Sequence, residues 1–164
     1  MRFSILFSCL VALAISACSI NPPISKRKYK GKLPIEKIKL PEGFQIDVFA
    51  ENVTNARSMD LSPNGTLFVG TRGEGKVYAL VDSDGDYQAD QQYILAEGLK
   101  MPNGVAFRDG DLYVAEVSRV LRFKDIENKL DNPGEPEVIY DEYPTETHHG
   151  WKYIAFGPDG KLYI

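Results

Sequence analysis

Three stretches of the chain repeat one pattern of residues around a glycine turn. They are residues 59–69 (MDLSPNGTLFV), 105–114 (VAFRDGDLYV) and 154–164 (IAFGPDGKLYI). In each, a leucine stands two residues after the glycine, an aromatic residue follows it, and a branched residue comes next. The glycines, Gly65, Gly110 and Gly160, are 45 and 50 residues apart. A period near that length, built from short strands, is typical of the blades of a β-propeller.

Each repeat predicts two antiparallel strands joined by a tight turn. Glycine supplies the positive φ that such a turn needs, and the aromatic and branched residues after it suit a pleated sheet. We expect third strands over residues 76–81 and 120–123, and an outer strand over 138–140. Helix signals are confined to a turn around residues 124–130, so the sequence predicts an all-β fold.

The third repeat stops inside its second strand, at Ile164. A propeller is a closed ring, and an unpaired strand edge promotes association with other chains. We therefore expect residues 33–164 to form about three blades of an incomplete propeller, truncated at the C-terminus. The usual propeller has roughly four to eight blades, so half or more of the ring would lie beyond this chain.

The first residues predict an exported protein. An apolar run over residues 5–15 follows a basic start and is shorter than the roughly 20 residues that span a bilayer. This layout predicts a signal peptide over residues 1–17. The small residues before Cys18 resemble the bacterial lipoprotein box, in which the cysteine is lipidated; the alternative is a plain signal peptide cut near Ala17. With Ser19 next, lipidation predicts an anchor in the outer membrane of a Gram-negative bacterium, facing the periplasm.

Residues 18–32 predict a tether between this anchor and the folded domain. The tether carries five basic residues, Lys26, Arg27, Lys28, Lys30 and Lys32. They either contact anionic lipid headgroups or belong to a solvated spacer. Beyond the tether the basic residues form no stripe, which argues against nucleic acid as a partner. Cys9 would leave with the signal peptide, so no disulfide is expected and an apolar core must supply the stability.

Four further motifs carry a family resemblance. They are residues 40–50 (LPEGFQIDVFA), 101–107 (MPNGVAF), 112–116 (LYVAE) and, the most specific, 148–160 (HHGWKYIAFGPDG). They resemble the glucose/sorbosone dehydrogenase family, and within it the sorbosone-dehydrogenase-like branch. The resemblance implies a six-bladed propeller that holds pyrroloquinoline quinone (PQQ), usually with calcium, in its central channel. It also implies an oxidoreductase that transfers hydride from an aldose or sorbosone-like sugar to the quinone, and passes electrons to an acceptor in the periplasm.

The only histidines of the chain, His148 and His149, are adjacent. Quinoprotein sugar oxidation needs a base for the hydroxyl proton, and imidazole suits this task because it titrates near working pH. Counting eight residues back from Gly157, as the family pattern does, assigns the base to His149. The family's His-x-Gly spacing assigns it to His148 instead; we favour His149. Without the resemblance, both would be interpreted as turn residues bonded to backbone.

Other polar residues are weaker candidates for the channel. Arg72 follows the second strand of the first repeat, where sugar quinoproteins often carry Thr-Glu-Arg. By this resemblance its guanidinium pairs with a carboxylate of PQQ, whereas the alternative is a surface arginine beside a turn. Asn103 and Glu116 are candidates for polar groups near the channel. Trp151 and Lys152 would line its mouth, although tryptophan is more often part of a core.

An acidic loop predicts a calcium site. Carboxylates stand at loop positions 1, 3, 5 and 9, in Asp82, Asp84, Asp86 and Asp90. Their spacing matches a calcium-binding loop, but the glycine is at position 4 and position 12 is not acidic. An ordinary acidic turn is the alternative. A calcium ion here is expected to brace a blade connection, because the resemblance assigns the catalytic calcium to parts that this chain lacks.

Two other functions are compatible with an all-β propeller. One is a non-catalytic binding scaffold, because a fold alone does not define a function. The other is a lactonase-like hydrolase with a central calcium, for which only Glu116 and Asn103 are candidate ligands. We favour PQQ-dependent sugar oxidation, with this chain as the N-terminal part of the enzyme and inactive on its own.

Overall fold

The computed structural model describes residues 31–164 of the chain. The expected signal peptide, Cys18 and nearly all of the expected tether lie outside the described residues. Helical structure in the described part is limited to two short 3-10 helices, η1 (Ile35–Lys37) and η2 (Ile126–Asn128). Within residues 31–164 no helix has the length and apolar character needed to cross a membrane.

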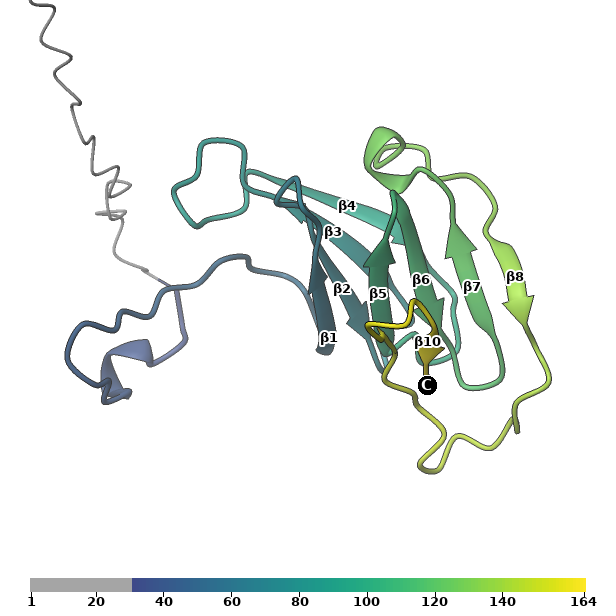
Figure 1. Ribbon diagram of the computed structural model, residues 1–164. Helices are drawn as coiled ribbons and strands as arrows, with labels where there is room; N and C mark the ends of the chain where they lie inside the picture. Colours follow the sequence, from purple (N-terminus) through teal and green to yellow (C-terminus); the bar gives the residue numbers. More distant parts are fainter. Residues whose placement is uncertain (1–30) are drawn as a thin grey trace, which may run out of the picture.

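The strands form two four-stranded antiparallel sheets and the beginning of a third (Figure 1). The first sheet has the order β1 (Ala56–Leu61), β2 (Leu67–Thr71), β3 (Val77–Val81), β4 (Gln91–Ala96). The second has the order β5 (Gly104–Arg108), β6 (Asp111–Ala115), β7 (Val120–Phe123), β8 (Glu137–Tyr140). The third consists of β9 (Ala155–Phe156) and β10 (Leu162–Tyr163). The prediction of an all-β fold is confirmed.

The three glycine turns occupy equivalent places in these sheets. Each joins the first strand of a sheet to the second, and Gly65, Gly110 and Gly160 have φ values of 90°, 89° and 79°. The predicted third strands correspond to β3 and β7, and the predicted outer strand to β8. The repeats are therefore successive blades of an incomplete propeller, as the sequence predicted.

The blades pack face to face, and the core lies between them. Side chains of β5 alternate between two neighbours, because successive residues of a strand point to opposite faces. Phe107 stacks on Phe68 of the first blade, with ring centroids 5.4 Å apart. Ala106 faces the third blade, in a cluster with Ile154. Across the same boundary, Tyr113 meets Phe156 edge to face at 5.0 Å.

The antiparallel order places the loops at two opposite ends of the blades. The turn end carries the glycine turns and the β3–β4 and β7–β8 loops. The other end, here called the histidine end, carries four connections: 72–76, 97–103, 116–119 and 141–154. In Figure 1 the last of these, yellow-green, passes beneath the ends of the second sheet. All residues predicted near the channel lie at the histidine end.

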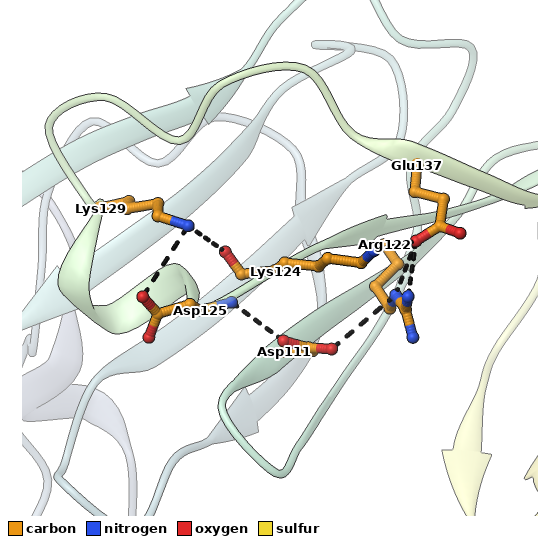
Figure 2. A network of polar contacts seen from close by, with 6 residues as sticks. All are labelled: Asp111, Arg122, Lys124, Asp125, Lys129 and Glu137. Carbon is orange, nitrogen blue, oxygen red and sulfur yellow. Dashed lines mark hydrogen bonds and ion pairs between the residues drawn. The ribbon is translucent and has the colours of Figure 1, made fainter.

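A network of charged residues joins the strands and the β7–β8 loop of the second blade (Figure 2). Glu137 on β8 lies 2.6 Å from Nη2 of Arg122 and 2.9 Å from Nζ of Lys124. Arg122 also approaches Asp111, at 3.8 Å. Hydrogen bonds from Lys124 and then Arg122 hold the pKa of Glu137 below the usual value of 4.5 for a glutamate.

The substitution Glu137→Gln is expected to lower the Tm slightly at neutral pH, since exposed ion pairs contribute little. Because the pKa of Glu137 is lower in the folded state, its contribution is complete above pH 4.5 and is lost as the pH falls through the folded value. The Tm difference from wild type should therefore shrink in acid. Thermal unfolding between neutral pH and about pH 3 tests this, with Glu135→Gln as the control. A difference that does not change with pH would contradict it.

Candidate functional site

Two distant connections supply the predicted site residues. Arg72 is the first residue after β2, and His148 and His149 lie between β8 and β9. The guanidinium carbon of Arg72 is 4.1 Å from the ring centroid of Trp151. The ring of His149 is 5.5 Å from that of Trp151, and His148 meets His149 edge to face at 4.2 Å. The structure thus brings Arg72, His148 and His149 together around Trp151, in what we call the Trp151 cluster.

The polar groups of this cluster are open to solvent. Arg72, His148 and His149 are exposed, while Trp151 is half-buried. Within residues 31–164 no carboxylate pairs with the Arg72 guanidinium, so its N–H donors are available to an anion. The aromatic face holds the cation through a cation–π contact, worth about 0.5–1 kcal/mol at an exposed position.

The histidine loop has a strained backbone. His149 has a φ of 55°, in the left-handed region that residues with a side chain rarely adopt. A conformation of this kind costs on the order of 1–3 kcal/mol and is often found at functional sites. The next residue, Gly150, donates its N–H to the carbonyl of Thr147 at 3.2 Å, and a Cβ there would collide with the carbonyl of Glu146. The turn is therefore too tight for a side chain at position 150.

Lys152 fastens this loop to the second blade. Its ammonium donates to the carbonyl of Val117 in the β6–β7 connection and to that of Gly150, the latter at 3.1 Å. It also lies 4.7 Å from the ring centroid of Tyr143. Burial lowers the pKa of Lys152, because the charged form loses hydration. The loop is thus held to the second blade through Lys152 and to the first through Trp151.

Asn103 joins three blades. Its side chain is completely buried. The amide oxygen accepts a hydrogen bond from Nε of Arg57 at 3.3 Å, and the amide nitrogen donates to the carbonyl of Lys152 at 2.9 Å. Arg57 belongs to the first blade, Asn103 precedes the second, and Lys152 precedes the third. The side chain therefore fixes the spacing of the blades at the histidine end.

Glu116 has a comparable structural environment. Its side chain is 3% exposed. One carboxylate oxygen accepts from the backbone N–H of Lys100 at 2.5 Å, and the other pairs with Nε of Arg119. Both oxygens are thus engaged in holding the 97–103 and 116–119 connections together.

The acidic loop lies at the turn end, away from the histidines. Carboxylate oxygens of Asp82, Asp84 and Asp86 lie within 4.8 Å of one another. Asp82 also accepts hydrogen bonds from the backbone N–H groups of Gly85 and Tyr87, at 2.8 and 2.9 Å. Asp90 accepts from the backbone N–H and the hydroxyl of Ser83, at 2.8 and 2.5 Å. The loop joins β3 to β4 within one blade, whereas we expected it at a connection between blades. The loop is bonded to the segment that precedes β1, since the N–H of Ala89 donates to the carbonyl of Phe49 at 2.7 Å.

An open hollow of about 780 Å³ runs along the first strands of the three blades. Its lining is mainly apolar and includes Met59, Phe107 and Phe156. The carboxylate of Asp60, which also lines it, accepts a hydrogen bond from the N–H of Phe107 at 2.6 Å. The Trp151 cluster does not line this hollow, so the two features are separate.

The fold and the cluster define the chain as a set of propeller blades with cationic, aromatic and imidazole groups at one end. Residues 31–164 match a family described as "Domain of unknown function (DUF7133)". The chain belongs to this family.

A similar solved structure is that of the PQQ-bound form of aldose sugar dehydrogenase from Streptomyces coelicolor, with a TM-score of 0.55 and 23% sequence identity. The match covers 71% of this chain and 39% of that one. An uncharacterized protein of Borreliella burgdorferi is 23% identical over 94 residues, which are 57% of this chain and 23% of that protein. The chain spans less than half the length of either protein. At this identity the structural likeness shows the fold, and the propeller expected from the resemblance is confirmed.

The sequence did not indicate that Trp151 lies at the centre of this cluster, nor that Arg57 donates a hydrogen bond to Asn103. The one available signal was the run His148-His149-Gly150-Trp151, which places an aromatic residue directly after the tight histidine turn.

Proposed function

We propose that the protein is part of a PQQ-dependent sugar dehydrogenase, an oxidoreductase of the glucose/sorbosone dehydrogenase type. The observation that carries this proposal is the meeting of Arg72 and His149 around Trp151, from connections that are far apart in the sequence. The PQQ-bound aldose sugar dehydrogenase supports it, because a protein with this fold holds that cofactor. The substrate would be an aldose or a sorbosone-like sugar. The assignment to the sorbosone-dehydrogenase-like branch rests on the sequence motifs alone.

The chemistry of the cluster fits such a cofactor. PQQ is a flat aromatic tricarboxylate, and an unpaired guanidinium at an aromatic face suits a planar anion. Arg72 would hold a carboxylate of the cofactor. When bound, PQQ supplies a quinone that accepts hydride from the sugar.

Residues of this chain would accept the proton that the sugar hydroxyl releases. In the part of the chain that the structure describes, no hydrogen bond to another residue occupies the ring nitrogens of His148 or His149. Either imidazole is thus free to take the sugar hydroxyl proton as a general base, and we favour His149 because of its contact with Trp151. The strained backbone at His149 is the second reason for this choice.

The decisive experiment uses the complete gene product with PQQ and calcium. Dye reduction is followed with a panel of aldoses, and thermal unfolding is followed with and without PQQ. We expect turnover with at least one sugar and a higher Tm with PQQ, because a ligand of the folded state stabilises it. No turnover with any sugar and no Tm shift would reject the enzyme.

That negative result would favour a binding scaffold, in which His148 and His149 tolerate alanine. A lactonase-like hydrolase is less well supported, because its candidate ligands Asn103 and Glu116 already have protein partners.

The same proposal includes the export of the protein. Lipidation at Cys18 would hold it at the outer membrane, facing the periplasm, where it would meet its sugar and its electron acceptor.

We also propose a structural calcium ion at Asp82, Asp84 and Asp86, where it would brace the β3–β4 loop. Calcium is expected to raise the Tm, by roughly 2–4 °C for each kcal/mol of binding free energy. Asp84→Asn should abolish this rise because it removes one of the convergent carboxylates. Asp131→Asn, at an exposed acidic residue of the β7–β8 loop, is the control. An equal rise in wild type and in Asp84→Asn would show that calcium acts elsewhere.

A further inference from the structure

Trp151 contacts both side chains on which the proposed function depends. Its ring lies 4.1 Å from the guanidinium carbon of Arg72 and 5.5 Å from the ring of His149. Arg72 comes from the β2–β3 connection of the first blade, and His149 from the connection that leads to the third. Trp151 therefore bridges two parts of the site that the backbone does not join directly.

The two side chains have little else to hold them. The backbone N–H of Arg72 donates to the carbonyl of Asn55 at 3.2 Å, which fixes the main chain but not the guanidinium. In the described residues, Trp151 is the aromatic partner of this guanidinium, and no carboxylate competes for it. His149 is exposed, and its ring contacts are those with His148 and Trp151.

The main chain at Trp151, in contrast, is firmly placed. The residue is half-buried and lies between Gly150, whose position excludes a side chain, and Lys152, whose ammonium bonds to two carbonyls. The main chain on both sides of Trp151 is thus held by the turn and by the second blade. Through the indole, the position of a first-blade cation depends on the histidine loop.

We propose that Trp151 is a positioning residue. Its ring fixes the position of the Arg72 guanidinium, the group that would hold the anionic cofactor, relative to the imidazole of His149. This inference rests on the proposed function. It adds that the anion-binding group and the base are aligned by one aromatic ring, which itself does no chemistry.

The first test needs no cofactor. It follows the ring protons of His149 and the Nε–H of Arg72 by NMR in the complete gene product. Trp151→Leu should shift the ring signals of His149 and the Nε–H signal of Arg72, because the ring current and the cation–π contact are lost. Trp151→Phe keeps an aromatic face and should retain part of both effects. Signals of His149 and Arg72 that are the same in Trp151→Leu and wild type would overturn the positioning role, whatever PQQ does.

The second test measures the affinity of the complete gene product for PQQ. Trp151→Leu should weaken PQQ binding about two- to fivefold, with recovery of part of the affinity in Trp151→Phe. If Trp151 acts through Arg72, the double variant Trp151→Leu/Arg72→Gln should bind no more weakly than Arg72→Gln alone. Additive losses would overturn the inference and leave the proposed function standing. No PQQ binding by wild type would overturn the proposed function instead, so the two failures are distinguishable.

Discussion

Replacing His149 with alanine is expected to lower the rate of sugar oxidation by the complete gene product about 100- to 10,000-fold, the range that a general base contributes. The loss should be large because no other imidazole in the described residues contacts Trp151 and could take over as the base. PQQ binding should change little, because Arg72 and Trp151 remain in place. The measurement is steady-state dye reduction together with PQQ titration.

A matched variant separates chemistry from stability. Since φ at position 149 is 55°, glycine fits this backbone better than alanine does. His149→Gly should therefore be more stable than His149→Ala by about 1 kcal/mol in urea unfolding, although both lose the base. Equal rate losses in two variants of unequal stability would assign the loss to the missing imidazole.

The neighbouring histidine provides the other comparison. If His148→Ala loses the rate and His149→Ala does not, the base is His148, as the alternative spacing indicated. If both variants keep the rate of wild type, neither imidazole is the base and the proposed mechanism fails.

The sequence predicted the blades well because the information for them is local. A glycine turn with flanking alternation specifies a strand pair within about 11 residues, and the recurrence of Gly65, Gly110 and Gly160 specified the repeat. The β4 strand (Gln91–Ala96) was not predicted. Half of its residues are exposed, and the strand is recognised by its pairing with β3 and not by an alternating pattern in its own sequence.

The candidate site was less predictable, because it depends on which connections share an end of the blades. The resemblance assigned Arg72 and the histidines. The contact of Arg72 with Trp151, however, follows from the antiparallel order of whole sheets, whereas that of His149 with Trp151 is local. Asn103 and Glu116 illustrate the opposite case. Both were candidates for polar groups near the channel, and their burial with both side-chain polar atoms hydrogen-bonded cannot be seen in a residue type or its spacing.

Asn103→Ala is expected to cause the largest loss of stability among the polar substitutions considered. It removes two hydrogen bonds and leaves the carbonyl of Lys152 and the guanidinium of Arg57 without this partner. A buried polar group left unsatisfied costs about 1–3 kcal/mol, and the cavity adds to this. The backbone around it is tightly packed, since a Cβ on Gly104 would lie 2.6 Å from the Lys152 carbonyl oxygen. Relaxation therefore has little room to compensate.

The control for this substitution is Asn128→Ala. It removes an exposed hydrogen bond of 2.7 Å, which the side-chain amide of Asn128 donates to Asp125, and should cost no more than about 0.5 kcal/mol. Urea unfolding of the two variants measures the difference. Because Asn103 holds the carbonyl of Lys152, its loss should also loosen the loop that carries His149, with broadened His149 ring signals in NMR. A loss as small as that of Asn128→Ala, with sharp His149 signals, would mean that the three blades keep their spacing without this amide.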